Sequence, residues 1–460
     1  MIAVQARGRV PRARFPHPCY PIAEDVKETK MSTSSRRTFI AASAAFSLGR
    51  VLGANDKLNI GIVGIGGRGN DHIKSYATLP DARIVALCDV NQAALETGQA
   101  AAKKLTGEQP KGYDDMRNLF ADKDVDAVSI TTPNHWHALS TIWACQAGKD
   151  VYCEKPACYN VHEGERMIEV ARKTGRMVQI GSQSRSLGYK IKAVQLLNDG
   201  VIGKVYMAKG LCFKRRPSIK HAEDSPVPPG VNWDMFLGPA PMHPFNALRF
   251  KYNWHWFWDT GNGDIGNQGV HEMDIARWGL GEVTWPKSVV STGGKYVYND
   301  DQETPNTQFA SFDYGDKELQ FEVRGLNTGG EGNITKGGGN YVGNLFYGAD
   351  GWMVVDGTGF KVYKGDKEDL AMEVKKESGA DTPPHMANFL AACRSRNYKE
   401  LHADVAIGVM SADLCHLANA SYRVGRKLAV DAAKGRFTGD GAAEANQLLT
   451  RVKYRAPYVV

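Results

Sequence analysis

The sequence predicts an α/β domain built on a doubly wound parallel sheet, followed by a second domain of the α+β class. Three observations support this division. Between residues 58 and 182, apolar strand-like runs alternate with helical segments, which is typical of a parallel sheet covered by helices. After residue 203, strand-like runs dominate. The chain of 460 residues is also too long for a single hydrophobic core.

A buried strand that runs into a glycine turn is predicted for residues 58–66, with a helix following from about residue 70 to 77. The glycine spacing is that of a dinucleotide-binding Rossmann domain, here assigned to residues 55–182. The free amides at the start of the helix are expected to bind a pyrophosphate. The residues expected to contact the cofactor in this turn are Gly64, Ile65, Gly66, Gly67, Arg68 and Gly69.

The second predicted strand, residues 82–88, ends at Asp89, twenty residues after Gly69. A carboxylate at this position accepts hydrogen bonds from a ribose diol and repels a 2′-phosphate. The sequence therefore predicts NAD, with NADP disfavoured. The alternative role for Asp89 is to cap the next helix.

Polar residues follow the third and fourth predicted strands, residues 127–131 and 150–153. Ligands bind to open parallel sheets at the carboxyl ends of their strands. His135 and His137 are two residues apart, which suits a metal only in an extended segment, and no third ligand cluster follows. We therefore predict no metal site. The polar segments are Thr132, Pro133, Asn134, His135, Trp136 and His137, and then Glu154, Lys155 and Pro156.

These motifs together resemble the Gfo/Idh/MocA family, named for glucose–fructose oxidoreductase, inositol dehydrogenase and rhizopine catabolism. The resemblance covers roughly residues 57–430. It is carried by Gly-Ile-Gly-Gly-Arg-Gly at 64–69, Cys-Asp-Val at 88–90, Thr-Pro-Asn-His-Trp-His at 132–137, Ala-Gly-Lys-Asp-Val-Tyr-Cys-Glu-Lys-Pro at 147–156 and Gly-Val-His-Glu-Met-Asp-Ile-Ala-Arg-Trp at 269–278.

The resemblance implies that Lys155 lies beside the nicotinamide and hydrogen-bonds the reacting hydroxyl, with Glu154 orienting it. A buried lysine suits this role because its ammonium stabilises a developing alkoxide. The plain alternative is a solvated lysine at a strand end. The resemblance also implies a cis peptide before Pro156 and contact of Asn134 with the nicotinamide end of the cofactor. For His137, cofactor contact and a packing or capping role remain open.

For residues 183–430 the resemblance implies a large, open, mostly antiparallel sheet that carries the substrate cleft and forms dimers or tetramers. Residues 431–460 are expected to wrap back as an arm. The predicted strands are 203–213, 286–298, 307–314, 318–325, 344–348 and 352–355, and the predicted helices are 189–198, 385–395 and 404–423.

The second expected catalytic element lies in residues 264–274. The resemblance implies an Asp four residues before a His on one helix face, but this chain has Asn267 before His271. His271 is the predicted general base, since its reference pKa is about 6.5; a buried structural histidine is the alternative. Asn267 is expected to position a substrate hydroxyl.

Three further segments have less specific interpretations. The aromatic stretch 253–259 suits either contact with a sugar ring or the core of a strand. Residues 214–216 are expected to form a solvated basic loop. The glycine-rich stretch 327–344 lacks the ending of a P-loop and predicts a mobile hairpin or a subunit contact.

The N-terminal segment predicts export. Arg36 and Arg37 precede an apolar run at 39–48 and small residues at 53–54, the pattern of a twin-arginine signal over residues 31–54. The apolar run is too short to span a membrane permanently. Residues 1–30 are expected to be a spurious or disordered extension, with translation starting at Met31. Export in the folded state by the twin-arginine machinery would carry a bound cofactor to the periplasm.

Charge excludes two classes of partner. Residues 1–54 hold nine Lys and Arg residues against three acids, which leaves 48 basic and 47 acidic residues in the remaining chain. A nearly neutral body indicates no nucleic-acid or anionic-membrane partner. The sequence thus predicts an exported NAD-dependent sugar or polyol oxidoreductase. The alternatives are a glycosidase or lyase that uses bound NAD catalytically, and a sugar sensor that binds dinucleotide without turnover.

Overall fold

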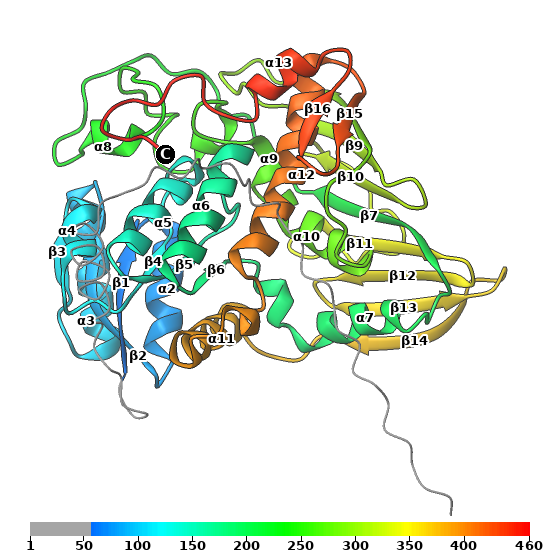
Figure 1. Cartoon of the computed structure of the whole chain (residues 1–460), viewed down its shortest axis with the longest axis horizontal. Coiled ribbons are helices and arrows are strands. Elements are labelled where there is room, and N and C mark those ends of the chain that lie inside the picture. Colours follow the sequence, from blue (N-terminus) through cyan, green and yellow to red (C-terminus); the bar gives the residue numbers. More distant parts are fainter. Residues whose placement is uncertain (1–56) are drawn as a thin grey trace, which may run out of the picture.

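The computed structural model describes residues 57–460. The expected extension and twin-arginine signal, residues 1–54, lie outside this range. Two sheets, one of six strands and one of ten, form the framework of the molecule (Figure 1). Within the described residues, no helix combines the length and apolarity needed to cross a membrane.

The first sheet is parallel throughout, with the order β3-β2-β1-β4-β5-β6, the order typical of Rossmann domains. The expected parallel sheet is thus confirmed; the short edge strand β3 was not expected, because its three residues carry no apolar run. The elements are β1 (Leu58–Val63), α2 (Gly67–Ala77), β2 (Ala82–Cys88), α3 (Gln92–Thr106), β3 (Lys111–Tyr113), α4 (Met116–Ala121), β4 (Ala127–Ile130), the 3₁₀ turn η2 (Asn134–Trp136), α5 (His137–Gln146), β5 (Asp150–Cys153), α6 (Val161–Thr174) and β6 (Val178–Ile180).

The second sheet has the order β14-β13-β12-β11-β7-β10-β9-β8-β15-β16. Only β7 and β10 pair in parallel, so the expected mostly antiparallel sheet is confirmed. The elements are η3 (Gln183–Ser186), α7 (Gly188–Asn198), β7 (Val205–Phe213), α8 (Trp233–Leu237), η4 (Asn253–Trp256), α9 (Gly263–Gly266), α10 (Gly269–Gly279), β8 (Ser288–Gly294), β9 (Thr307–Asp313), β10 (Glu318–Arg324), β11 (Tyr341–Gly348), β12 (Gly351–Asp356), β13 (Gly359–Lys364), β14 (Asp369–Lys375), α11 (Thr382–Ser395), η5 (Tyr398–Glu400), α12 (Val405–Val424), β15 (Leu428–Asp431), β16 (Arg436–Thr438) and α13 (Ala442–Gln447).

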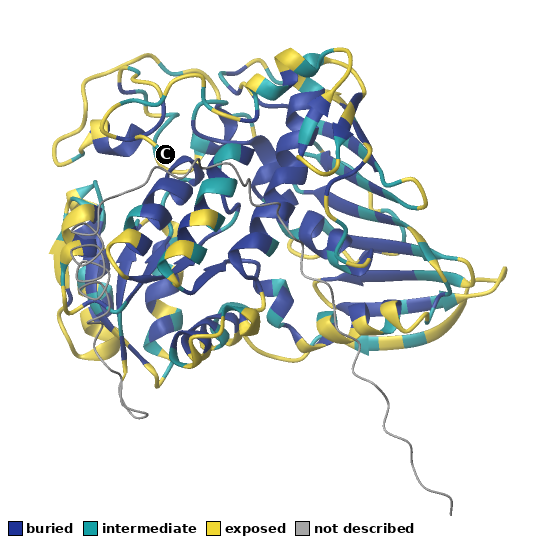
Figure 2. Cartoon of the chain, in the orientation of Figure 1, coloured by how far each residue is buried: buried dark blue, intermediate teal, exposed yellow. Residues whose placement is uncertain are grey.

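Helix α12 joins the two halves of the molecule. It packs against α6 and β6 of the first domain and against α10 and β8 of the second, so it lies between the sheets (Figure 1). Almost every residue over its first four turns is buried (Figure 2), including the polar residues Asp413, His416 and Asn419, because the helix packs against both domains. Helix α11 follows the second sheet in the sequence but packs on the first domain, where Met386 and Phe389 belong to the same core as Leu58.

Side chains and glycines define the ends of the two helices that support the site. The Asn160 side chain accepts from the Glu163 amide at the start of α6, and Asp404 accepts from the Ala406 amide at the start of α12. Both helices end at a left-handed glycine, Gly175 and Gly425, which satisfies free carbonyl groups at no steric cost.

Candidate active site

The glycine turn after β1 has one closed side and one open side. Gly64 has φ of +89°, and an ideal Cβ on Gly69 would lie 2.1 Å from the Gly64 carbonyl oxygen. These two glycines are therefore required by the fold itself. By contrast, Gly66 and Gly67 are exposed, and a Cβ on either would meet no atom within 4 Å among the described residues. The open side leaves the first amides of α2 available to a ligand.

Asp89 lies at the end of β2, as expected. Its carboxylate accepts hydrogen bonds from the Ile65 amide at 2.5 Å and from the Asn91 amide at 2.8 Å. The next helix, α3, is capped by the side chain of Asn91, so Asp89 does not cap it through its first-turn amides. Its place beside the glycine turn is the one required for a carboxylate that binds ribose.

The loop after β4 presents two buried oxygen atoms without partners. Thr132 Oγ1 and Asn134 Oδ1 have no hydrogen-bond partner among the described residues, although Asn134 Nδ2 donates to Asn262 Oδ1 at 2.5 Å. A buried polar atom that is left unpaired costs about 1–3 kcal/mol. Acceptor and hydroxyl groups at this sheet edge, beside the open glycine turn, fit a nicotinamide dinucleotide.

The two histidines of this loop both make internal contacts. The His137 ring lies between the carbonyl oxygens of Pro156 at 2.6 Å and Thr132 at 2.9 Å. It therefore links the loop after β4 to the loop after β5. Pro133 immediately precedes the 3₁₀ turn η2. His135 lies between the carbonyls of Phe236 and Thr260. These contacts favour the packing role for His137.

Glu154 is a buried centre of hydrogen bonding. Its Oε1 accepts from Arg68 Nε at 2.8 Å, from Gln183 Nε2 at 3.1 Å and from His72 Nε2 at 2.9 Å. Burial raises the pKa of Glu154, but the charge of Arg68 and the hydrogen bond from His72 outweigh it and hold the pKa well below its usual range. Arg68, which was expected at the cofactor, thus connects the glycine turn to Glu154 through its side chain.

His72 links Glu154 to the strand behind it. Burial lowers the pKa of His72, so its ring is neutral at pH 7. Because ionised Glu154 can only accept, His72 Nε2 carries the proton, and Nδ1 accepts from Ser129 Oγ at 2.8 Å. Sequence reasoning missed this residue, since a histidine on the inner face of an amphipathic helix gives no separate signal.

Lys155 extends from the end of β5 toward the second domain. Its Nζ donates to the carbonyl oxygen of Asn267 at 3.1 Å and to Oδ1 of the same residue at 3.4 Å. Burial lowers the pKa of Lys155. The peptide before Pro156 is cis, as the resemblance implied. Glu154 accepts a hydrogen bond from the backbone amide of Lys155 at 3.2 Å and not from its ammonium. The acceptors that orient Nζ are therefore the two oxygens of Asn267.

Asn267 and His271 do not share a helix face, and that expectation was wrong. Helix α9 ends at Gly266 and α10 begins at Gly269, so Asn267 lies in the break between them. Closely spaced glycines disfavour a continuous helix. The break directs Asn267 to Lys155.

His271 occupies the first turn of α10 and is half-buried. Burial and the charge of Lys155 lower the pKa of His271 well below its usual value. The structure gives its ring no hydrogen-bond partner among the described residues. A neutral imidazole beside an ammonium can accept a proton from a substrate hydroxyl.

Three residues around Asn267 were not predicted. The Tyr252 hydroxyl accepts from Asn267 Nδ2 at 3.1 Å and from Arg216 Nη1 at 3.0 Å, and Arg216 binds Asp264 with two hydrogen bonds. Residues 214–216 are therefore not a simple solvated loop, because Lys214 also binds Gln268. The aromatic stretch forms the 3₁₀ turn η4, not a strand.

Two family models match this chain. The model described as "Oxidoreductase family, NAD-binding Rossmann fold" matches residues 58–182, and its companion, "Oxidoreductase family, C-terminal alpha/beta domain", matches residues 189–299 and 348–460. The chain belongs to the Gfo/Idh/MocA oxidoreductase family. Its first domain carries the NAD-binding fold of the family at the glycine turn described above.

Similar Gfo/Idh/MocA sequences include two kinds of curated protein. Inositol 2-dehydrogenase from Salmonella typhimurium is 40% identical over 156 residues, which cover 33% of this chain and 45% of that protein. A glycosyl hydrolase family 109 protein from a Shewanella species is 27% identical over 162 residues, 34% of this chain and 35% of that protein. The chain thus spans half or less of the length of these relatives.

Solved structures share the fold over most of the chain. The WlbA dehydrogenase from Bordetella pertussis, in complex with NADH and UDP-GlcNAcA, has a TM-score of 0.59 at 21% identity and covers 81% of this chain and 99% of its own. The aldose-aldose oxidoreductase from Caulobacter crescentus, complexed with glycerol, has a TM-score of 0.62 at 18% identity and covers 81% of this chain and 100% of its own.

Proposed function

We propose that this protein is an NAD-dependent oxidoreductase that oxidises or reduces a hydroxyl-bearing carbon of a sugar, polyol or glycoside. When bound, the nicotinamide supplies hydride acceptor and donor chemistry. In the oxidative direction, Lys155 Nζ donates a hydrogen bond to the substrate oxygen and stabilises its developing negative charge. His271 accepts the hydroxyl proton.

One observation carries this proposal: Lys155 of the dinucleotide domain reaches Asn267 of the second domain, and its ammonium acts on His271, a histidine without a hydrogen-bond partner among the described residues. Asn267 holds the lysine ammonium, and the pKa of His271 is lowered in part by that ammonium. Similarity to inositol 2-dehydrogenases supports a polyhydroxylated substrate.

The test begins with untagged protein purified without added cofactor. Its ultraviolet spectrum reveals any bound nicotinamide, and candidate polyols and sugars are then titrated. We expect the absorbance of reduced nicotinamide to appear with a subset of them. If the folded protein, supplied with NAD or NADP, reduces neither with any polyol, aldose or glycoside, the proposed function is wrong.

A second candidate is a redox-neutral glycosidase or lyase, which the matches to glycosyl hydrolase family 109 proteins favour. Supplying a single glycoside separates the two. Release of a free sugar with no net change in cofactor identifies the glycosidase, whereas accumulation of reduced cofactor identifies the dehydrogenase. A sensor would bind sugar and dinucleotide without either change.

We also propose that NAD is preferred over NADP, that the protein is exported through the twin-arginine pathway, and that it forms a homo-oligomer. Tyr347, Trp352 and Tyr363 lie opposite one another on β11, β12 and β13 and stay only half-buried, and this aromatic face of the second sheet supports a subunit contact. Light scattering measures the assembly. Fractionation of cells that express the Arg36→Lys, Arg37→Lys double variant tests export, which should then fail.

A further inference from the structure

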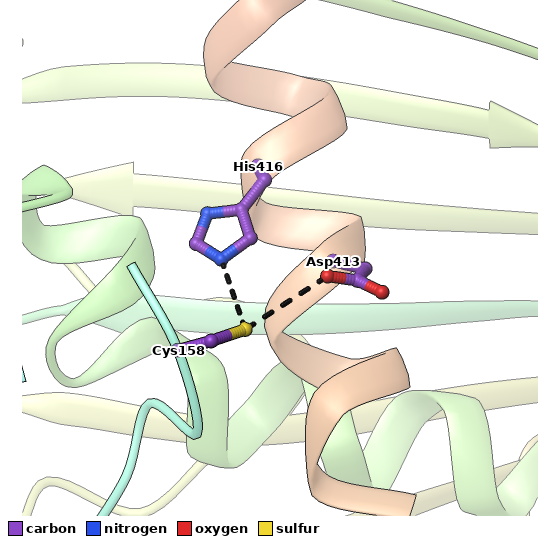
Figure 3. A group of neighbouring side chains, drawn as sticks. All are labelled: Cys158, Asp413 and His416. Atoms are coloured by element: carbon purple, nitrogen blue, oxygen red, sulfur yellow. Dashed lines mark hydrogen bonds between the residues drawn. The ribbon is translucent and has the colours of Figure 1, made fainter. Parts of the chain in front are cut away.

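A buried cluster of three side chains lies behind the catalytic loop. Cys158, three residues after Lys155, points toward Asp413 and His416 on α12 (Figure 3). The Cys158 sulfur lies 3.6 Å from His416 Nε2 and 4.0 Å from Asp413 Oδ1. One donor atom from each residue lies within 4.8 Å of the others. We propose that these three residues bind a zinc ion that attaches the Lys155 loop to α12.

The spacing of the donor atoms suits zinc. Zinc–sulfur bonds of about 2.3 Å and zinc–nitrogen bonds of about 2.0 Å, at a tetrahedral angle, separate sulfur and nitrogen by about 3.5 Å. The Cys158 and His416 atoms are within a few tenths of an ångström of this separation. Asp413 Oδ1 lies 4.0 Å from the sulfur and would move about half an ångström closer on binding. A thiolate, an imidazole and a carboxylate are also a donor set that favours zinc over magnesium or calcium.

The polar atoms of the cluster are poorly satisfied by the protein alone. Asp413 is fully buried, and its Oδ2 has no hydrogen-bond partner among the described residues. A thiol has one proton, so Cys158 can donate to His416 or to Asp413, but not to both at once. A divalent cation would satisfy the carboxylate, the thiolate and the imidazole together.

Charge balance supports the same conclusion. A thiolate and a carboxylate carry two negative charges, and neutral His416 adds none, so a divalent zinc ion gives a neutral site. Isolated buried charges are costly, whereas this combination leaves no net charge in the core. Binding would release the thiol proton of Cys158 and any proton held by Asp413.

The site would connect the two halves of the catalytic centre. Cys158 belongs to the loop that carries Lys155. On α12, Asn419 Nδ2 donates to the Asn262 carbonyl at 2.9 Å, and Cys415 Sγ contacts the Ile265 carbonyl at 3.3 Å. These contacts support the segment that leads to Asn267. The metal, with a water molecule as its fourth ligand, would therefore hold Lys155 in register with Asn267.

The experiment measures metal in untagged, full-length protein purified without chelators from zinc-supplemented cells. Elemental analysis should find about one zinc per chain. Exchange with Co²⁺ should produce the thiolate-to-cobalt charge-transfer band and the visible bands of a tetrahedral site. Chelation by a strong zinc ligand should lower Tm, and added Zn²⁺ should restore it.

Substitutions locate the ion. Cys158→Ser should lose the charge-transfer band and reduce zinc content at least tenfold, and His416→Gln provides a second test if the first variant does not fold. The matched control is Cys415→Ser, which replaces another buried thiol, next to His416 on α12. This variant should retain both the zinc content and the charge-transfer band. Wild-type protein with less than about a tenth of an equivalent of zinc and no cobalt band would overturn the proposal, as would zinc retained by Cys158→Ser or a different metal in its place.

Discussion

In the first domain, Thr132 Oγ1 and Asn134 Oδ1 are buried and have no hydrogen-bond partner within residues 57–460. In the second domain, the side chains of Arg216 and Asn267 already bond other protein groups. The dinucleotide side thus has polar atoms that the protein leaves without partners, and a bound dinucleotide could supply those partners. On the substrate side the polar side chains around Asn267 are paired with each other, while the His271 ring has no hydrogen-bond partner among the described residues. The cofactor side is built on a short glycine motif that can be recognised in the sequence, whereas the substrate side is assembled from loops distant in sequence.

The largest effect is expected for Lys155→Met. Methionine keeps a flexible side chain of similar length but removes the ammonium that stabilises the substrate oxygen, so kcat should fall by about 10³- to 10⁴-fold. Turnover at saturating dinucleotide measures this loss. The control is Lys173→Met at the end of α6, which should behave like wild type; unchanged hydride transfer in Lys155→Met would end the catalytic assignment.

His271→Ala should reduce kcat/KM by about 10²- to 10³-fold. In the wild type the base must be neutral to accept a proton, and the pKa of His271 is lowered. Activity in the oxidative direction should therefore persist as pH falls through 6.5, the ordinary histidine value, and decline only below it. A pH profile of kcat/KM shows this acid limb. The limb should vanish in His271→Ala and remain in the exposed control His221→Ala.

Glu154→Gln tests the buried connection between the glycine turn and the catalytic loop. Loss of the charge leaves Arg68 without its ion pair, so the free energy of unfolding should fall by about 2 kcal/mol. The matched control is Glu169→Gln, whose pair with Arg166 is exposed and should contribute less than about 0.5 kcal/mol. Urea denaturation measures both, and equal losses would contradict the account.

Glu154 also predicts a pH dependence of stability. Its pKa in the folded protein is well below the usual value, so the folded state binds this proton less tightly than the unfolded state. The stabilisation is therefore complete above the unfolded pKa of about 4.3 and is lost as pH falls through the folded pKa. Glu154→Gln should lose this component of the acid dependence.

The smallest effect is expected for Asp89→Asn. The Ile65 and Asn91 amides donate to different oxygens of the Asp89 carboxylate. Asparagine has a single acceptor oxygen, so it keeps one of these hydrogen bonds, and it carries no charge. NAD affinity should fall by about tenfold, or 1.4 kcal/mol, and NADP affinity should rise because the repulsion of a 2′-phosphate is removed. Titration with both dinucleotides measures the ratio. The matched control is Asp115→Asn at the N-cap of α4; asparagine also caps helices, and the ratio should stay unchanged.

Short-range patterns made the first domain predictable. The glycine turn, Asp89 and the Glu154–Lys155 pair each follow a strand within a few residues, and local propensity places them at one edge of a parallel sheet. The polar partners of Glu154 were not predictable. His72 and Gln183 reach it only after helix and strand have packed, and their sequence contexts are ordinary.

The second domain depends more on distant contacts. Tyr252 meets Asn267, and Arg216 meets Tyr252, through loops whose course no periodicity defines. The helix break before His271 follows from closely spaced glycines, where one continuous helix was expected. Helix α11 was correctly predicted, but its packing on the first core through Phe389 was not. Cys158 and His416 lie 258 residues apart in sequence.

A dinucleotide titration of Gly66→Ala beside the wild type tests the central claim most directly. A Cβ at Gly66 meets no described atom, and its backbone, with φ of −64°, accepts alanine. We therefore predict unchanged folding and Tm, one NAD bound per wild-type chain by calorimetry, and at least tenfold weaker binding by the variant. Equal affinity of both proteins, or a folded wild type that binds neither NAD nor NADP, would contradict the account.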